Sequence, residues 1–235
     1  MAATTRYETI AAHDGGTYEA FCAVPESGSG PGVLVFQEIF GINDNMRGIA
    51  ERLAGEGFVV LVPDVFWRIE PRFERKDESG LADGMAIVQK LDWSTVDADI
   101  RSTFEHLRSM PECTGPVGAM GFCLGGALAF MAATAGLGVA AAVPYYGSAI
   151  NGMLDRVERL ECPTLFHYGA TDPFIPEEDI AEVEAAVADR PHVTVHRYDA
   201  GHAFSNWDAP SMYDEAAAEE AWGRTIAFLR ANLSS

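Results

Sequence analysis

The chain has 235 residues, of which 48% are hydrophobic and 22% charged, so it is long enough to bury a large core and is not expected to be disordered. Its 35 acidic residues outnumber its 16 basic residues, which gives a formal net charge of −19. A protein of this charge repels phosphate backbones and anionic membranes, so we expect neither a nucleic-acid partner nor a membrane.

The cysteines and the apolar runs indicate a cytoplasmic protein. The chain does not open with a basic and then apolar signal segment, and no uninterrupted apolar run approaches the length of a membrane span. The four cysteines lack the C-x-x-C spacing of zinc and redox sites, so we expect reduced thiols. Three of them lie in or beside apolar runs and are expected to be small buried residues, namely Cys22, Cys113 and Cys162.

The N-terminal part of the chain predicts an antiparallel hairpin with strands at residues 7–11 and 17–24. From residue 33 onward, strand-like runs alternate with helix-like runs. The further expected strands cover residues 33–36, 58–62, 117–120, 139–146, 164–168 and 193–198. The expected helices cover residues 45–56, 95–108, 127–133, 176–188 and 213–233. This alternation predicts an α/β fold, with a mostly parallel sheet and helices on both faces.

One segment, residues 64–79, follows neither the helical nor the strand period. It contains three large aromatic residues and four of the sixteen basic residues. A loop of this length in a compact domain is often functional. Since we find no repeat, low-complexity tract or long linker, we expect one domain over residues 1–235.

The sequence GFCLGG at residues 121–126 stands between a strand-like run and a helix-like run. This order matches the nucleophile elbow, G-x-nucleophile-x-G, of α/β-hydrolases, with Cys123 where most such enzymes have serine. Glycines at 121 and 125 suit a strained turn against which neighbouring segments pack closely. The alternative is a structural cysteine in a glycine-rich turn.

A thiol nucleophile needs a base and a residue that orients the base, and in this fold class the chain order is nucleophile, acid, histidine. Asp172 and His202 follow Cys123 in that order, each just beyond a predicted strand. The carboxyl ends of parallel strands are where open α/β sheets place their ligands. The sequence therefore predicts a triad of Cys123, His202 and Asp172. Taken singly, Asp172 could be a turn or cap residue and His202 a surface residue.

Acyl transfer also needs hydrogen-bond donors for the developing oxyanion. The backbone amide directly after the nucleophile, that of Leu124, is one expected donor. The second usually lies in the loop after an earlier strand, and here we expect the amide of Ile39.

Three motifs together resemble the dienelactone hydrolase (carboxymethylenebutenolidase) family: QEIFG at residues 37–41, the elbow at 121–126 and GHAF at 201–204. The resemblance covers nearly the whole chain, including YYG at 145–147 and GATD at 169–172. The pairing of QEIFG with a cysteine elbow is specific, because general serine esterases do not show it. The resemblance implies a single α/β-hydrolase domain without a metal or organic cofactor, and a Cys-His-Asp triad that opens lactone esters.

In that family the glutamate of QEIFG keeps the resting thiol protonated or inert and takes its proton when substrate binds. The resemblance therefore implies that Glu38 is a switch beside Cys123. The role is physically reasonable, since a nearby anion disfavours the thiolate and can accept its proton. The alternative for Glu38 is a plain loop carboxylate or an ion pair with an arginine.

The resemblance leaves the substrate open. The best-studied members hold a substrate carboxylate with arginines, one of them shortly after the catalytic histidine, where this chain has Asn206 followed by Trp207. The other arginine belongs to the segment after Pro63. The remaining candidates for substrate contact are Arg68, Arg72, Arg75, Phe40 and Tyr145. Losing one guanidinium removes a bidentate partner for a carboxylate, which favours a less anionic or differently shaped ester.

The sequence predicts a cytoplasmic cysteine hydrolase that acts on a small lactone or enol ester and is a monomer or a small homo-oligomer. Two alternatives stay open. One is a carboxylesterase or thioesterase that uses the same residues on an open-chain ester. The other is a non-hydrolytic protein that binds a small ligand or senses oxidants through Cys123.

Overall fold

The computed structural model describes residues 3–234, which form one eight-stranded sheet in the order β1-β2-β4-β3-β5-β6-β7-β8. Strands β1 and β2 form an antiparallel hairpin, β2 pairs antiparallel with β4, and all other neighbours are parallel. The strands are β1 (Thr4–Ala11), β2 (Thr17–Val24), β3 (Gly30–Phe36), β4 (Val59–Pro63), β5 (Cys113–Phe122), β6 (Ala142–Tyr145), β7 (Thr164–Gly169) and β8 (Val193–Tyr198). The expected mostly parallel sheet with an N-terminal hairpin is confirmed.

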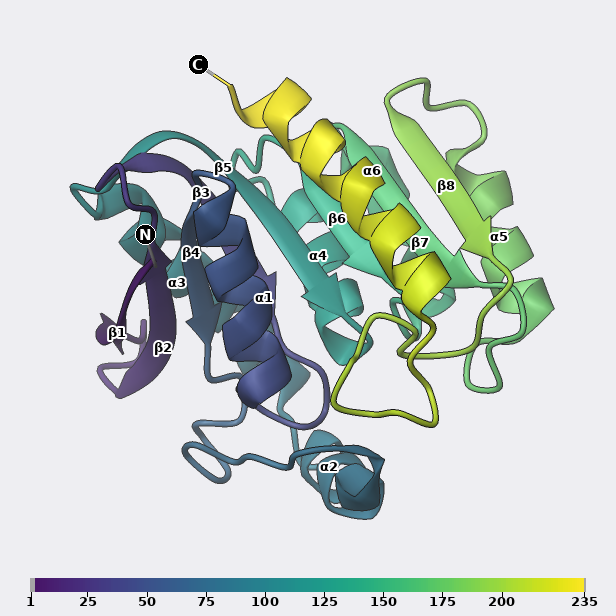
Figure 1. The fold of residues 1–235 in the computed structure, drawn as a ribbon, viewed down its shortest axis with the longest axis horizontal. Coiled ribbons are helices and arrows are strands. Elements are labelled where there is room, and N and C mark those ends of the chain that lie inside the picture. The colour runs from purple at the N-terminus through teal and green to yellow at the C-terminus, as the bar shows by residue number, and fades with distance from the viewer. Residues whose placement is uncertain (1–2, 235) are drawn as a thin grey trace.

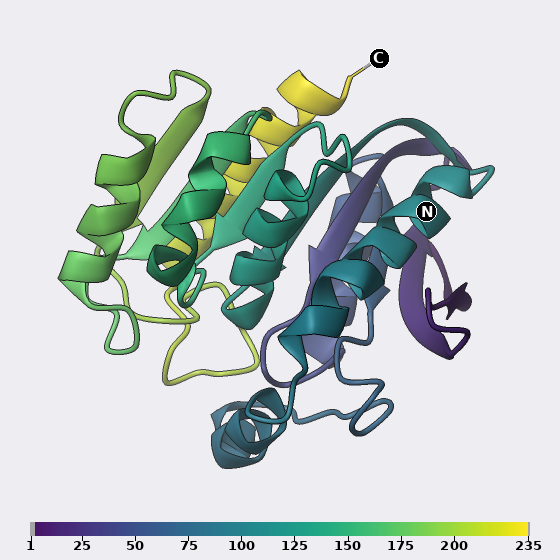
Figure 2. The same ribbon diagram turned by 180° about the vertical axis from the view of Figure 1, so that it is seen from behind.

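Helices cover both faces of this sheet. The first face carries α1 and α6, which lie in front of the strands in Figure 1, and the second carries α3, α4 and α5, which lie in front in Figure 2. The helices are α1 (Asp44–Gly55), α2 (Leu81–Val88), α3 (Trp93–Ser109), α4 (Leu124–Thr134), α5 (Glu177–Val187) and α6 (Glu215–Leu233), with short 3-10 segments η1 (Glu78–Gly80) and η2 (Ile150–Arg159). Within the described residues, no helix combines the length and apolarity needed to cross a bilayer.

The central strands are buried because helices cover them on both sides. Every residue of β4, β6 and β7 is buried, and so are the last five of β3 and the last six of β5. Their runs of apolar residues are typical of parallel strands in the middle of such a sheet. Burial of apolar side chains on both faces therefore fixes the positions of the central strands, and with them the ends of the loops that follow.

Three short helical elements lie outside the predicted set, η1, α2 and η2. Helix α2 contains Gly84, which lowers the helix propensity of a short segment. The glycine allows a close approach: a Cβ on Gly84 would lie 2.6 Å from the carbonyl oxygen of Ile39. Figure 1 shows α2 beyond the carboxyl ends of the parallel strands, at the same edge as the loop before α6.

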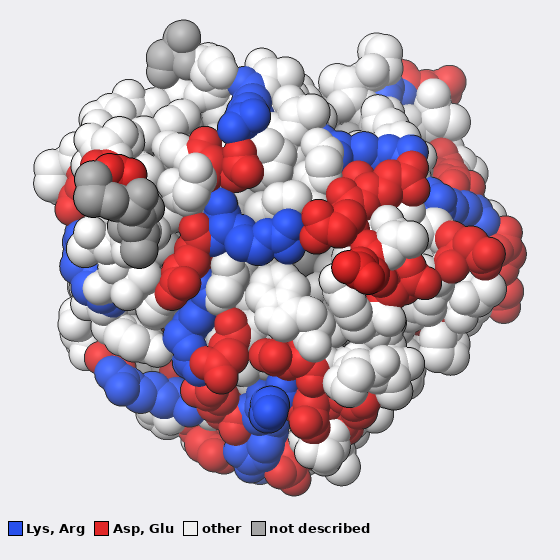
Figure 3. All heavy atoms as spheres, viewed as in Figure 1, with Lys and Arg blue, Asp and Glu red and all other residues white. Residues whose placement is uncertain are grey.

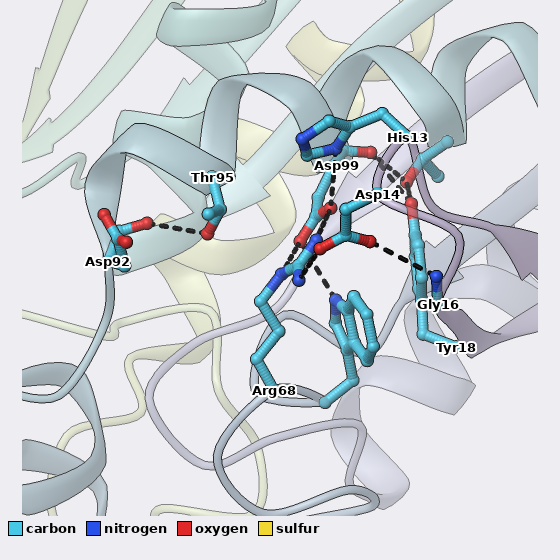
Figure 4. A network of polar contacts seen from close by, with 10 residues as sticks. His13, Asp14, Gly16, Tyr18, Arg68, Asp92, Thr95 and Asp99 are labelled. Atoms are coloured by element: carbon cyan, nitrogen blue, oxygen red, sulfur yellow. Dashed lines mark hydrogen bonds and ion pairs between the residues drawn. The ribbon is translucent and has the colours of Figure 1, made fainter.

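The segment 64–79 is mostly irregular, as expected, and is attached at both ends. At its start, the Arg68 guanidinium donates to Asp99 of α3 and to Asp14 of the hairpin turn, and the Trp67 indole also donates to Asp99 (Figure 4). Near its end, the Arg75 amide donates to the Phe40 carbonyl at 2.8 Å. These contacts join the hairpin, α3 and the turn after β3.

Candidate active site

Cys123 lies on the sharp turn between β5 and α4. Its backbone has φ 54° and ψ −117°, a conformation that is costly for a residue with a side chain. The neighbouring glycines make room for it: a Cβ on Gly121 would collide with the Gly125 carbonyl, and a Cβ on Gly125 with that of Phe36 at the end of β3. This conformation presents a half-buried thiol at the carboxyl edge of the sheet.

The residues predicted to serve as base and acid meet at that edge. His202 follows β8 and Asp172 follows β7, and the Nδ1–H of His202 donates to Asp172 Oδ2 at 2.7 Å. The other oxygen of Asp172 accepts the amides of Phe174 (2.8 Å) and Ile175 (3.1 Å), which fixes the carboxylate. With Nδ1 held in this way, Nε2 is the nitrogen of His202 that can take up a proton.

The environment of His202 favours its protonated form. The imidazole is buried, which by itself lowers its pKa, but its contacts with the Cys123 sulfur and with Asp172 outweigh burial and raise the pKa to about 10. An imidazolium beside a sulfur stabilises the thiolate form of that sulfur. The arrangement can therefore supply an ion pair of thiolate and imidazolium for attack on a carbonyl.

Glu38 lies in the interior beside this pair. Its Oε2 accepts a hydrogen bond from the side-chain amide nitrogen of Asn206 at 2.6 Å, and its Oε1 accepts one from the Tyr146 hydroxyl at 3.2 Å. Burial raises the pKa of Glu38, although His202, Asn206 and Tyr146 each act in the opposite direction. The Tyr146 ring lies 5.1 Å from the His202 ring, so Glu38, Tyr146, His202 and Cys123 form one continuous cluster.

The two backbone amides predicted to be oxyanion donors lie at the start of α4 and in the turn after β3. The amides of Gly126 and Ala127 donate to the Cys123 carbonyl at 2.9 and 3.4 Å, and Leu124 precedes them at the first position of α4, where an amide has no partner within the helix. The turn after β3 is closed by a hydrogen bond from Gly41 to Glu38 at 3.4 Å, so Ile39 lies inside that turn. The role of both amides as oxyanion donors stays a prediction.

The arginine candidates for substrate contact are all engaged with carboxylates. Arg68 pairs with Asp14 and Asp99 at the hairpin and α3. Arg72 makes two hydrogen bonds to Glu19 of β2, and Arg75 pairs with Asp83 of α2.

The other candidates also have partners in the fold. The Tyr145 hydroxyl bonds to Thr225 of α6 at 2.6 Å, on the first face of the sheet. Trp207 packs against α1, where a Cβ on Gly48 would lie 2.8 Å from its ring. Phe40 is buried in the turn that receives the Arg75 amide, and Asn206 is fully buried against Glu38.

Three residues of the cluster were not singled out from the sequence. Tyr146 directly follows β6, Ser148 has its hydroxyl 3.7 Å from the Cys123 sulfur, and the half-exposed Phe174 lies edge-on to His202 at 5.2 Å. The signal for all three was their position after a buried strand at the same edge of the sheet. Tyr146 (φ 34°) and Ala203 (φ 54°) also have positive φ, as does Cys123, so backbone strain gathers around this cluster.

The chain is similar to known proteins in both sequence and structure. Residues 18–233 match the sequence profile of the dienelactone hydrolase family. A carboxymethylenebutenolidase of Pseudomonas sp. (strain P51) is 37% identical over 94% of this chain and 93% of its own length. The crystal structure of a dienelactone hydrolase-like promiscuous phosphotriesterase, P91, from metagenomic libraries is 26% identical with a TM-score of 0.82, and covers 98% of this chain and 99% of that one.

A more distant solved structure shows the same fold. The dienelactone hydrolase of Anabaena variabilis is 16% identical and superimposes with a TM-score of 0.75 over 99% of both chains. The eight-stranded, mostly parallel sheet with its cysteine elbow is thus an α/β-hydrolase fold. From the sequence match and the shared architecture together, the chain belongs to the dienelactone hydrolase family.

Proposed function

We propose that this protein is a cysteine hydrolase of small lactones or enol esters, with Cys123 as nucleophile, His202 as base and Asp172 as the residue that orients His202. The observation that carries the proposal is a strained cysteine beside a buried histidine whose Nδ1 is held at 2.7 Å by a buried carboxylate. Membership of the family makes the chain a hydrolase that acts on ester bonds. The name carboxymethylenebutenolidase of its relative favours a lactone substrate.

The geometry supports the following sequence of steps. When substrate covers the site, the Cys123 thiol passes its proton to Glu38, and the sulfur, as a thiolate beside protonated His202, attacks the ester carbonyl carbon. The amides of Leu124 and Ile39 stabilise the oxyanion. The carbon–oxygen bond then breaks, His202 gives its Nε2 proton to the leaving oxygen, and a thioester remains on Cys123. A water molecule gives a proton to His202 and attacks the thioester, which releases the acid, and Glu38 returns its proton to the sulfur.

Glu38 is proposed to control the thiol. Its buried carboxylate interacts with His202 and, through Tyr146, with the surroundings of Cys123. Because burial raises its pKa, Glu38 binds a proton more readily than a surface carboxylate. It can therefore accept the thiol proton when a bound substrate covers the site and keep the reactive thiolate scarce in the resting enzyme.

The test is hydrolysis by Cys123→Ala beside the wild type. We expect kcat/KM to fall by at least ~10³-fold, because removing the nucleophile disables a unit whose members act together. Cys113→Ala removes a thiol at the start of β5 and should leave kcat/KM within about twofold. Full activity of Cys123→Ala would refute the proposal.

A panel of substrates distinguishes a lactone hydrolase from an enzyme that acts on open-chain esters. Wild-type kcat/KM is measured for a cyclic enol ester, a saturated lactone, an aryl ester and an acyl thioester. A preference for the cyclic enol ester supports the proposal, and a preference for the aryl ester or thioester supports a carboxylesterase or thioesterase that uses the same residues. Oxidation or ligand retention at Cys123 without turnover of any of the four would support a sensing role instead.

A further inference from the structure

We infer that the site takes esters that carry no carboxylate, with an apolar group of the substrate held against Phe174. The inference rests on the proposed function, since it names the substrate class of the same site. Four observations support it: the hydrogen bonds of Asn206, the ion pairs of the arginines after β4, the acidic residues of the site and the exposure of Phe174.

Asn206 is a neutral residue that cannot turn toward a substrate. The side chain is fully buried, its amide nitrogen donates to Glu38 Oε2 at 2.6 Å, and its amide oxygen accepts the Asp208 amide at 3.0 Å. Both ends of the amide are therefore occupied. Rotating it outward would leave Glu38 with one buried hydrogen bond fewer, which costs free energy.

The arginines after β4 are also unable to receive a substrate carboxylate without losing a partner. Arg68 already holds two carboxylates in the network of Figure 4, Arg72 holds Glu19 in a two-pronged contact, and Arg75 holds Asp83. Exchange of one carboxylate for another yields little net free energy, because the attraction gained equals one that is lost.

The ionisable groups gathered at the site are mainly acidic. Glu38 and Asp172 both lie buried beside His202, and Glu38 receives its hydrogen bonds from neutral donors among the described residues. The whole chain adds a net charge of −19. On the face seen in Figure 3, the basic side chains lie next to acidic ones, so they do not form a separate positive surface there. An anionic substrate would approach against this field.

Phe174 supplies an exposed apolar surface beside His202. Phe174 is 53% exposed, and its ring lies 5.2 Å from the His202 ring. Its backbone amide donates to Asp172, so its backbone position is fixed by the catalytic cluster. Exposed apolar side chains beside a reactive centre are typical of a surface that binds an apolar group.

The inference is tested with two aryl acetates of equal shape, 4-acetoxybenzamide and 4-acetoxybenzoate. They carry the same acyl group on leaving groups that differ by one negative charge. We expect wild-type kcat/KM for the amide to exceed that for the carboxylate by at least about tenfold at low ionic strength, and the ratio to shrink as NaCl is added, since salt screens the repulsion. Equal rates, or faster hydrolysis of the carboxylate, would overturn the inference.

The variant Phe174→Arg tests where the preference arises. Because Phe174 is exposed, the substitution should not prevent folding, and we expect it to lower the amide-to-carboxylate ratio by about tenfold. Phe174→Leu keeps an apolar side chain and should leave the ratio within about twofold. An unchanged ratio in Phe174→Arg would contradict contact of the substrate with this residue.

The proposed function and the substrate class are contradicted by different results. Loss of activity on 4-acetoxybenzamide in Cys123→Ala supports the proposed function whatever the ratio of the two esters. Retention of that activity contradicts the proposed function and the substrate class with it. Turnover of neither ester by the wild type contradicts the substrate class, and the panel of lactones and open-chain esters then decides the proposed function. A wild type that depends on Cys123 but prefers the carboxylate contradicts the substrate class alone.

Discussion

Among the described residues, Glu38 is a buried carboxyl group without a guanidinium or ammonium partner. Both of its oxygens are hydrogen-bonded, but the donors are a phenol and an amide, which offset only part of the free energy of removing a carboxylate from water. The consequence is a raised pKa for Glu38, with burial as the largest cause. In its charged form, Glu38 therefore lowers the free energy of unfolding.

We predict that Glu38→Gln stabilises the protein at neutral pH. The folded-state pKa of Glu38 is above its unfolded value, so wild-type stability is highest below the unfolded pKa and falls as pH rises through the folded pKa. Glutamine does not titrate and keeps an acceptor for Asn206 and a donor for Tyr146. The gain should reach about 1 to 3 kcal/mol at pH 8 and be smaller at pH 5.

Calorimetric unfolding at several pH values measures this difference. The matched control is Glu70→Gln, in the exposed part of segment 64–79, which should change stability by less than about 0.5 kcal/mol at any of these pH values. A gain for Glu38→Gln that grows as the pH is lowered would reverse the sign and disprove the explanation.

A second residue-scale prediction concerns His202. In Cys123→Ala, burial still lowers the pKa of His202 while the raising effect of the sulfur is lost, so the pKa should fall below its value of about 10. The measurement is titration of the His202 ring by NMR in both proteins. Cys113→Ala should leave the titration where it is, and an unshifted pKa in Cys123→Ala would show that the sulfur has no influence on His202.

At the scale of single residues, some members of the site could be predicted from the sequence and others could not. The sequence predicts that Cys123, Asp172 and His202 lie close together, because each follows a strand with a clear apolar pattern. The contacts of Asn206 could not be predicted, because its partner Glu38 is 168 residues away and a loop residue carries no periodic signal. Tyr146 was within the quoted motif, but its contact with Glu38 spans 108 residues and depends on a positive φ.

At the scale of elements, the elbow depends on how closely α4 approaches β3. We predict that Gly125→Ala destabilises the protein by at least about 3 kcal/mol, because the added Cβ would collide with the Phe36 carbonyl, a backbone atom with little freedom to move. The matched control is Gly223→Ala in α6, where a Cβ meets open space. It should stabilise the protein by about 0.5 to 1 kcal/mol, since alanine favours a helix interior more than glycine does.

Urea denaturation with analysis of both midpoint and slope measures the two effects. Opposite signs for the same chemical change are expected. Equal effects at Gly125 and Gly223 would mean that the turn relaxes easily, in which case the elbow is not held in place by close contact between α4 and β3.

Elements with a strong pattern were predictable and the short helical elements were not. The boundaries of β2 and β8 coincide with the predicted ones, because alternating or buried apolar residues mark them. Helix α2 has Gly84 in its interior, and η2 starts after Ala149 in the left-handed region and includes a residue, Met153, with non-helical dihedral angles. Tertiary contact rather than local propensity decides such elements.

For the whole molecule, the excess of acidic residues sets the response to salt. We predict that NaCl raises the melting temperature at pH 7 by about 2–4 °C, because counterions screen self-repulsion among 35 acidic residues that only 16 basic residues offset. The comparison is the same titration near pH 4.5, the isoelectric point, where net repulsion is absent and salt weakens the ion pairs. A lower melting temperature in salt at pH 7 would show that ion pairs outweigh self-repulsion.

The Glu38–Asn206 contact also bears on how the protein folds. Its hydrogen bond joins residues 168 positions apart, and the Tyr146 and Asp172 bonds join others across 108 and 30 positions. Parallel pairing of distant strands is slow to form, because loop closure costs entropy before contacts compensate for it. The cluster therefore assembles only after β3, β6, β7 and the chain beyond β8 have come together. Recovery of a reactive, guarded thiol should be among the last events of refolding.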